Sequence, residues 1–563
     1  MTGATSVESL PSPSTWELLR SRWLWLVLLA GTGVLGTLTL YFSWNVFDEG
    51  FTAKGGDIVL RGQLLFRDFL TLYGPAQFYL LAGLYWTFGV QLLVLRLWSI
   101  LLVALFALVV YLVAARLSGD SRRRGLAALG ASLLVLLHQV PSSGYSMVPA
   151  AALLIAAALP LQYFARTGEQ RYLGAASLLI GLAALFRWEQ GIFGLAALAG
   201  ALAFWLWCSR PFTLKSSTGL AMWALGPALG LMAVVYLPLF AAAGLDNFIQ
   251  DVLVHALRDF KAYRGIDFVR PQVWSILHAF EAGQPGQAIG RGIPLAGTVA
   301  VGIAVAGVLL RALWASRSRP AGGAMRPDAA LTAAIFVALA VLGLLNQMRV
   351  RPDVSRSVLI IASAAPLFTY LWQVWMARTQ APLRVAAVSA WVLVLATAGA
   401  GAVSTTLETM QRRPLVRTES PHSRFMYNPV HSEGYNALIA YVRDHTQPGE
   451  LIYSGVTDHQ VLLLNDAMLY FLTGRDGPTR FYEMDPGLAN TRDAQQHIAA
   501  ALDKAGVRLL VLWELKSTED NLSSRPNDID ILDRYIRVHY AMQTRFGDYQ
   551  VWMRKSETVS ASR

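Results

Sequence analysis

The sequence predicts a polytopic α-helical membrane protein with about eleven transmembrane helices, outer interfacial helices and a C-terminal soluble α/β domain. Of its 563 residues, 55% are hydrophobic and 15% are charged, whereas roughly 25% are charged in an ordinary soluble domain. Several apolar runs reach the roughly 20 residues that a transmembrane helix needs. After about residue 405, charged residues become frequent and apolar runs shorten. A purely soluble protein is therefore excluded.

Apolar runs of spanning length recur between residues 21 and 404, the predicted transmembrane domain. The first run follows Arg20 and Arg22. It is too long for a signal peptide and lacks a small-residue cleavage site, so we predict that it remains as an anchor. The predicted spans lie near 23–42, 91–115, 125–140, 148–165, 172–187, 190–208, 220–243, 292–314, 329–345, 357–376 and 385–404.

Basic residues in the short loops predict the orientation, because such residues stay on the cytoplasmic side. A cytoplasmic tail at 1–20 places most loop arginines inside, and the outer loop 141–147 has no basic residue. A full span at 73–89 would put Arg122, Arg123 and Arg124 outside, so this aromatic-rich segment is predicted to be an interfacial or re-entrant helix. The expected location is a plasma or inner membrane, with outer loops at 43–90 and 245–291.

The last segment, 405–563, is predicted to be an extracytoplasmic α/β domain. Helix-like stretches at 434–445, 492–505 and 529–540 alternate with strand-like runs at 451–453, 509–513 and 549–553. Such alternation is typical of a small α/β domain.

Composition also excludes several kinds of site. The net charge is +11, but no nucleic-acid-binding signature accompanies it, so a nucleic acid is not an expected partner. The lone Cys208 rules out a disulfide framework and a cysteine-rich metal site.

Candidate functional residues gather on the predicted outer side, in separate segments that the fold could bring together. Ionisable residues are almost absent from the spans themselves, and Arg96 is expected to snorkel to the outer end. Carboxylates and guanidinium groups on one face suit a phosphate-bearing lipid and a hydroxylated acceptor. The candidates are Asp48, Glu49, Arg67, Asp68, Tyr73, Arg187, Glu189, His255, Arg258, Arg349, Arg351 and Asp353.

Each candidate also has a structural explanation. Arginines at a membrane boundary are commonly solvated or bound to lipid headgroups, and a lone histidine such as His255 is often a structural hydrogen-bonding residue. In the terminal domain, a polar loop-like stretch could face the membrane site, but ordinary surface is the favoured interpretation. That stretch contains Asn465, Arg475, Arg480, Tyr482 and Asp485.

The order of motifs in residues 20–300 resembles the GT-C superfamily of membrane glycosyltransferases, in the branch of protein O-mannosyltransferases and lipid A aminoarabinose transferase. The outer loop Val254–Phe260 and the terminal domain are also similar to that family. One departure is Gly74-Pro75, where family members often have Lys-Pro. The resemblance rests on the pair Asp48-Glu49 after the first span, a short helix at about 50–62, the segment Arg67-Asp68-Phe69…Tyr73-Gly74-Pro75, an aromatic helix closed by Phe88-Gly89, and a span with Arg96.

The resemblance implies a GT-C-like enzyme that transfers a sugar from a polyprenyl-phosphate donor to a lipid, glycan or protein acceptor on the outer face. Asp48 would act as general base and Glu49 would support it or position the acceptor. A cation would stabilise the leaving phosphate, with Arg67, Arg187, Arg258 or Arg351 as candidates. No cofactor is required, although oxygen ligands from Asp48 and Glu49 would permit a divalent cation.

Two other classes of function remain open. A transporter or flippase for a lipid-linked saccharide would need charged relays near the membrane midplane, and the sequence shows almost none. A non-catalytic membrane protein could instead bind glycans or a partner through the terminal domain, in which case the acidic pair Asp48-Glu49 would be dispensable.

Overall fold

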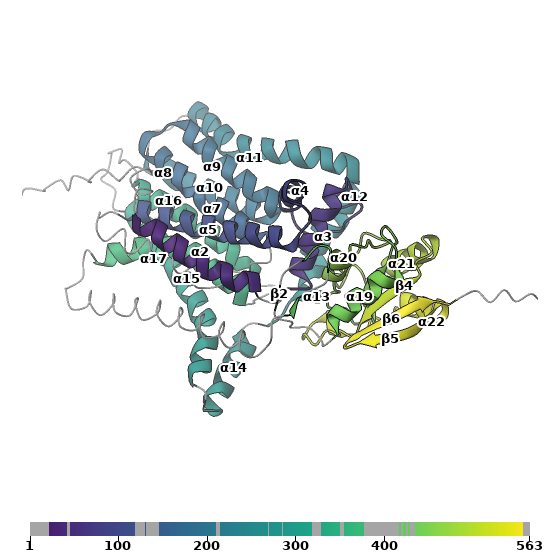
Figure 1. The fold of residues 1–563 in the computed structure, drawn as a ribbon. Coiled ribbons are helices and arrows are strands. Elements are labelled where there is room, and N and C mark those ends of the chain that lie inside the picture. The colour runs from purple at the N-terminus through teal and green to yellow at the C-terminus, as the bar shows by residue number, and fades with distance from the viewer. Residues whose placement is uncertain are drawn as a thin grey trace, which may run out of the picture.

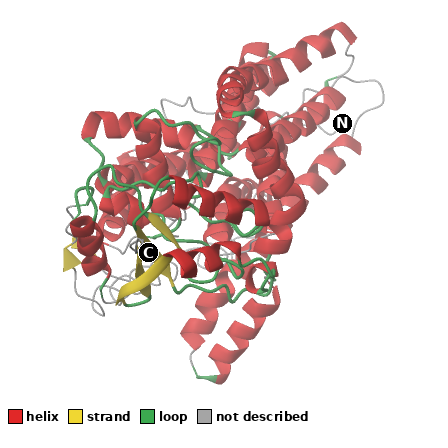
Figure 2. Ribbon diagram, turned by 90° about the vertical axis from the view of Figure 1, so that its right-hand side faces the viewer, coloured by secondary structure: helices red, strands yellow, loops and turns green. Residues whose placement is uncertain are grey.

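A computed structural model describes residues 22–41, 45–118, 130, 146–209, 214–267, 269–283, 285–317, 328–348, 354–376, 416–417, 420–423, 426–427 and 434–555. A bundle of long helices forms the larger part, and a smaller domain with a β-sheet lies at one end of it (Figure 1). The strands gather in that domain, and helices make up the rest (Figure 2). This arrangement confirms the predicted fold class.

The bundle consists of apolar helices. Among the described residues, seven helical segments are long and apolar enough to cross a membrane, and Arg22–Thr32 and Gln170–Phe186 are shorter apolar helices. Nine of the eleven predicted spans coincide with described helices, while those at 125–140, apart from residue 130, and 385–404 lie outside the described residues. The bundle helices are α2 (Arg22–Tyr41), α5 (Leu92–Leu117), α7 (Met147–Ala156), α8 (Ala158–Thr167), α9 (Gln170–Phe186), α10 (Trp188–Cys208), α11 (Leu214–Ala243), α15 (Pro285–Arg317), α16 (Ala329–Met348) and α17 (Val354–Met376).

Small residues let the bundle helices approach closely, as is usual in membranes. A Cβ on Gly181 of α9 would lie only 2.8 Å from the Cα of Ala228 in α11. α11 contains Pro227 and Pro238, which interrupt its backbone hydrogen bonds. Next to the first proline, the backbone N–H of Ala228 donates to the hydroxyl of Ser177 at 3.1 Å. The Ser177 hydroxyl thus accepts a hydrogen bond from a backbone N–H group that an apolar bundle would leave unpaired.

Short helices cover the end of the bundle that faces the sheet domain. α4 is 13 residues long, about 20 Å of helix, which is too short to cross a hydrocarbon core of roughly 30 Å. It is seen end-on in Figure 1, crosswise to the bundle helices, and Trp86 and Phe88 are exposed on it. The predicted short helix at 73–89 is confirmed. These short helices are α3 (Asp48–Leu60), α4 (Ala76–Phe88), α12 (Leu245–Phe248), the π-helix η1 (Ile249–Asp259) and α13 (Phe260–Arg264). A further short helix, α14 (Val269–Glu281), instead packs against α15 away from the sheet domain (Figure 1).

The sheet of the terminal domain has the strand order β3-β4-β6-β5. β3 pairs with β4 in parallel, and the other two pairings are antiparallel. Every residue of β4 is buried, as expected for a central strand covered on both faces. The elements are β1 (Val416–Arg417), β2 (Met426–Tyr427), α19 (Tyr435–His445), β3 (Tyr453–Val456), α20 (Met468–Thr473), α21 (Arg492–Lys504), β4 (Leu509–Trp513), the 3-10 helix η2 (Leu522–Ser524), α22 (Ile531–His539), β5 (Tyr540–Phe546) and β6 (Tyr549–Arg554).

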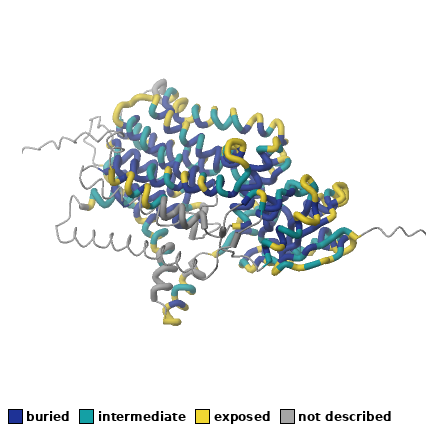
Figure 3. The backbone as a smooth tube through the Cα atoms, in the orientation of Figure 1, coloured by how far each residue is buried: buried dark blue, intermediate teal, exposed yellow. Residues whose placement is uncertain are grey.

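The short outer helices and the sheet domain share one hydrophobic core. Phe51 of α3, Phe78 of α4, Phe471 of α20 and Val511 of β4 belong to the same buried cluster, and buried backbone continues across the junction in Figure 3. A Cβ on Gly50 would lie 2.3 Å from the backbone nitrogen of Met468. Only glycine allows α3 and α20 to pack this closely, so the two parts of the chain are held in fixed contact.

A buried lysine adds an ionic contact between the same two parts. Lys54 of α3 is 1% exposed, and its Nζ lies 3.0 Å from Asp57 and 2.7 Å from Asp476 of the sheet domain. Arg61 also pairs with both carboxylates. Burial of Asp476 opposes its ionisation, but the hydrogen bond from Arg61 and the charge of Lys54 outweigh that effect and lower its pKa to about 2.

The contact between Lys54 and Asp476 predicts an acid-sensitive junction. The folded pKa of Asp476 lies below its ordinary value of 3.8, so its stabilising contribution is complete above pH 4 and is lost as the pH falls toward 2. The shift corresponds to about 2 kcal/mol. We expect the melting temperature of Asp476→Asn in detergent to lie below that of the wild type at pH 6, with a gap that narrows below pH 4. A gap of constant size between pH 6 and 2.5 would contradict this assignment.

Candidate functional site

The described candidates fall into three groups on the side of the bundle that faces the sheet domain. The first is the acidic pair at the start of α3, the second surrounds Arg187, and the third borders a cavity. Arg349, Arg351 and Asp353 lie outside the described residues. The members of the three groups are Asp48 and Glu49; Tyr73, Arg187 and Glu189; and Arg67, Asp68, His255 and Arg258.

Glu49 forms a buried ion pair with Arg96. The Nε and Nη2 atoms of Arg96 donate to Oε1 and Oε2 of Glu49 at 2.7 and 3.1 Å, and the two side chains are 6% and 5% exposed. The prediction that Arg96 snorkels was wrong, because a buried carboxylate on α3 neutralises it in place. Both oxygens of Glu49 are thus engaged, and the pair ties α3 to α5.

Asp48 precedes Glu49 in the sequence, but its side chain has a different environment. It is the first residue of α3, where the helix N-terminus favours negative charge. The side-chain amide of Asn45 donates to Asp48 Oδ2 at 3.1 Å, and the amide oxygen of Asn45 accepts from the backbone N–H groups of Phe47 and Asp48 at 2.9 and 3.2 Å. Asp48 is partly exposed. Of the two acidic residues, it is the one placed to meet a ligand.

A buried carboxyl group of the sheet domain, Glu483, interacts electrostatically with Asp48. Glu483 is 8% exposed, and its pKa is raised well above the ordinary value by burial first and then by the charges of Asp485 and Asp48. Arg264 of α13 lies 3.8 Å from Asp485 and donates to the carbonyl oxygen of Leu463 at 3.2 Å. The acidic group at the start of α3 therefore includes a carboxyl group of the sheet domain.

The polar stretch of the terminal domain is not ordinary surface. Arg480 reaches Asp251 of η1, and the other four members of the stretch are buried. The favoured interpretation of this stretch was therefore wrong. Arg480 and Asp485 contact the helical part of the chain, whereas Asn465 and Arg475 bond within the sheet domain; that the stretch faces the membrane site stays a prediction. Two charged residues flank two aromatic ones at Arg480-Phe481-Tyr482-Glu483, and such mixing is the signal that could have indicated a buried polar contact.

The second group brings two predicted segments together. Arg187 pairs with Glu189 at 2.6 Å, and its guanidinium lies 4.8 Å from the centre of the Tyr73 ring. The backbone N–H of Gly74 donates to the carbonyl oxygen of Phe186 at 3.0 Å. A Cβ on Gly74 would lie 2.2 Å from the carbonyl oxygen of Leu185. No side chain fits at position 74 without a shift of Leu185, and Arg187 is a described cation that lies beside this turn.

A small apolar hollow adjoins the second group. Its volume is about 350 Å³, and it lies between the start of α4 and the outer half of α11. Pro75 and Tyr79 line it together with Leu64, Val235, Pro238, Leu239 and Ala242. The hollow therefore begins one residue beyond Gly74 and offers an apolar surface beside the Tyr73–Arg187 contact.

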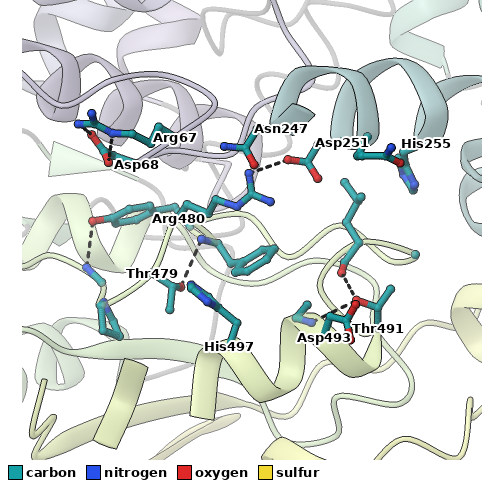
Figure 4. A pocket seen from close by; sticks show the side chains of 18 of the residues that line it. Arg67, Asp68, Asn247, Asp251, His255, Thr479, Arg480, Thr491, Asp493 and His497 are labelled. Carbon is teal, nitrogen blue, oxygen red and sulfur yellow. Dashed lines mark hydrogen bonds and ion pairs between the residues drawn. The ribbon is translucent and has the colours of Figure 1, made fainter. Parts of the chain in front are cut away.

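The third group borders a cavity of about 1150 Å³ between η1, residues 63–68 and the sheet domain. Arg67 and Asp68 form a two-point ion pair at 2.9 and 2.7 Å, and Arg258 does the same with Asp259 at 2.8 and 2.9 Å. Figure 4 shows Arg480 reaching across the cavity wall to Asp251, at 2.6 Å. Burial raises the pKa of Asp251 against the opposing effect of Arg480. Asp48 and Glu49 do not line this cavity.

His255 is the buried histidine of the cavity wall. It is 1% exposed, and neither ring nitrogen has a hydrogen-bond partner among the residues that the structure describes. Burial lowers its pKa despite the nearby charges of Asp485, Asp259 and Asp251. A neutral imidazole offers one donor and one acceptor, and His255 is among the residues that line the cavity.

The residues present do not fit a divalent cation at Asp48 and Glu49, because Arg96 engages both oxygens of Glu49. In the described part of the chain, no group of three or more His, Cys, Asp or Glu residues is placed to hold a metal ion.

Comparison with known proteins gave structural similarities only. No protein-family model matches the chain, and no curated protein matches it. ArnT from Cupriavidus metallidurans bound to undecaprenyl phosphate is similar with 14% identity and a TM-score of 0.41 over 95% of this chain and 99% of that one. The apo form of that ArnT gives 13% identity and a TM-score of 0.43 over 94% and 97%. Arabinofuranosyltransferase AftD from mycobacteria gives 15% identity and a TM-score of 0.45 over 94% of this chain and 41% of that one.

Proposed function

We propose that the protein is a glycosyltransferase that moves a sugar from a polyprenyl-phosphate donor to an acceptor on the outer face of a membrane. The observation that supports this most is the placement of Asp48 and Arg187 on one cluster. The ring of Phe51, one turn after Asp48, lies 6.0 Å from that of Tyr73, and Arg187 lies over Tyr73. The helix that begins at Asp48 and the segment that contains Arg187 thus meet at these two rings.

Asp48 is the proposed general base. It would accept the proton of an acceptor hydroxyl as that oxygen forms a bond to the anomeric carbon of the donor sugar. The bond from this carbon to the phosphate oxygen breaks, and its electron pair leaves with the polyprenyl phosphate. The role requires Asp48 to lie within hydrogen-bond reach of the hydroxyl. Its partial exposure is consistent with that requirement.

Arg187 is the proposed partner of the donor phosphate. Negative charge grows on the phosphate as the sugar leaves, so a fixed cation there stabilises the transition state. The apolar hollow at Pro75 and Tyr79 lies beside Tyr73 and would take the first part of the polyprenyl chain. Arg67 and Arg258 are weaker candidates, because their side chains are exposed whereas that of Arg187 is largely buried. Arg351 stays a prediction.

Replacing Arg187 tests the donor site. In nanodiscs with a polyprenyl-phosphate sugar, we expect Arg187→Ala to release polyprenyl phosphate roughly 10²-fold more slowly than the wild type, a size typical of losing one transition-state donor. Arg187→Lys should recover part of the rate, since it restores the charge without the planar fork. Arg171→Ala, which removes an arginine from the exposed Arg171–Glu169 pair, is the matched control. Wild-type release by folded Arg187→Ala would exclude this role.

The function itself is tested with the purified full chain, a labelled polyprenyl-phosphate sugar and cell-envelope extract as the source of acceptor. Glycosyl transfer predicts equal amounts of free polyprenyl phosphate and of label in a new glycoside. A non-catalytic glycan-binding protein would leave the donor intact.

A further inference from the structure

The cavity of the third group has an unusual charge balance for a protein expected to meet phosphate. Three arginines and five aspartates line it. Three of the aspartates pair with those arginines, and Asp476 pairs with Lys54 and Arg61 outside the lining. Asp493 is left as the lining carboxylate with no ion pair among the described residues. The aspartates are Asp68, Asp251, Asp259, Asp476 and Asp493. A ligand with added negative charge would meet net repulsion here, because like charges in a confined site are unfavourable.

None of the three lining arginines is available as an unpaired cation. Arg67 and Arg258 each form a two-point pair with the next residue, and Arg480 is held by Asp251 and by the carbonyl oxygen of Phe66 at 3.1 Å. A phosphate monoester binds best to guanidinium groups whose donors converge on it. Binding one here would require an existing ion pair to open.

The remaining polar groups suit hydroxyls instead. His255 presents a buried ring with both nitrogens unpartnered among the described residues, and a hydroxyl both donates and accepts hydrogen bonds. Asn247 and Thr479 line the same space (Figure 4). The paired arginines and aspartates present planar edges with donors and acceptors side by side. At about 1150 Å³, the cavity exceeds the roughly 300–1,000 Å³ typical of a drug-sized ligand, so an extended ligand fits.

We infer that this cavity binds the acceptor and that the acceptor is an uncharged, hydroxyl-rich saccharide rather than a phosphorylated one. Calling this ligand the acceptor rests on the proposed glycosyl transfer. Binding of a saccharide in the cavity does not depend on the donor. Charged groups relate this cavity to the proposed base. The charge of Asp485 raises the pKa of His255 in the cavity wall and that of Glu483, and the charge of Asp48 also raises the pKa of Glu483.

Binding is measured with the full chain in nanodiscs and without donor, so that it is independent of catalysis. The probes are a fluorescent neutral hexasaccharide of hexoses, the same hexasaccharide with one phosphate monoester, and a serine- and threonine-rich peptide of similar size. We expect the neutral saccharide to bind at least about tenfold more tightly than the other two, since a ligand charge placed among aspartates costs affinity. His255→Phe, which keeps an aromatic ring but removes both nitrogens, should weaken the neutral saccharide about tenfold.

A charge substitution provides the selectivity test. Asp493 is exposed at the start of α21 and lines the cavity, and no ion pair to it is found among the described residues. Asp493→Lys should reduce the ratio of the affinity for the neutral saccharide to that for the phosphorylated one by about tenfold. Asp520→Lys makes the same charge change at an exposed position outside the cavity lining and should leave the preference unchanged. An equal response to both lysines would overturn the inference.

Three other results would also overturn it: tighter binding of the phosphorylated probe, tighter binding of the peptide, or no saccharide binding at all. Failure of the proposed function is distinguishable from these. In that case, the neutral saccharide would still bind and respond to Asp493→Lys, but the labelled donor would not be consumed.

Discussion

Asp48→Asn is expected to abolish sugar transfer while leaving the protein folded. A positioned general base contributes roughly 10²–10⁴-fold to a rate, and asparagine keeps the shape of the side chain and its contact with Asn45 but cannot accept the proton. Because Asp48 is partly exposed, its loss should change the melting temperature little. The measurement is the initial rate of polyprenyl phosphate release in nanodiscs at saturating donor.

The control for this variant is Asp246→Asn. Asp246 is an exposed aspartate in α12, on the same side of the bundle and outside the cavity lining. It should transfer sugar at the wild-type rate. Full turnover by Asp48→Asn would remove Asp48 from the chemistry, and equal losses in both variants would indicate a general effect of charge at the outer side.

The second large effect is expected at the Glu49–Arg96 pair. Arg96→Met leaves the Glu49 carboxylate buried without its partner, which costs about 3–5 kcal/mol in the free energy of unfolding. The double variant Glu49→Leu with Arg96→Met removes both charges and should regain most of that loss, because apolar replacement of a buried pair is often neutral or better. Denaturant unfolding of the full chain in mixed micelles measures both changes.

The exposed pair Arg171–Glu169 again provides the comparison, since such pairs contribute about 0–1 kcal/mol. Arg171→Met should therefore cost little. If the double variant at Glu49 and Arg96 is as unstable as Arg96→Met alone, the contribution of the pair lies in specific geometry rather than in compensation of charge.

The helical part of the fold was predictable because apolar length is a local property of the sequence. Every predicted span that falls on described residues coincides with a helix. The alternation of helices and strands after residue 405 was predictable for the same reason. β5 (Tyr540–Phe546) was not predicted, because its polar residues, Gln543, Thr544 and Arg545 among them, lack the apolar character of β4. This strand lies at the sheet edge and forms by pairing with β6.

The grouping of the candidate segments was predictable, but the partners of the individual side chains were not. Sequence grouped Asp48, Tyr73, Arg187 and His255 on one side of the membrane, and the structure brings their segments to one end of the bundle; that this end is the outer one stays a prediction. The pairing of Glu49 with Arg96 and of Lys54 with Asp476 joins distant positions. A charged residue appears misplaced in an apolar segment until the tertiary fold supplies its counter-charge, which is why snorkelling was predicted for Arg96.

The cavity was missed for a related reason. Its wall combines η1, residues 63–68 and the loop before α21, and no local pattern marks those segments as neighbours. The burial of Asp485 and Glu483 depends on α3 and α13 covering them. The polar composition of the loop instead suggested surface.

The most direct test of the account uses sealed proteoliposomes that contain the full chain and a labelled polyprenyl-phosphate sugar, with envelope acceptor added only outside. Glycosyl transfer at the outer face predicts release of polyprenyl phosphate together with a new glycosidic bond, and loss of both in Asp48→Asn. Movement of the intact lipid-linked sugar across the membrane without formation of a glycosidic bond would contradict the account and identify a transporter instead.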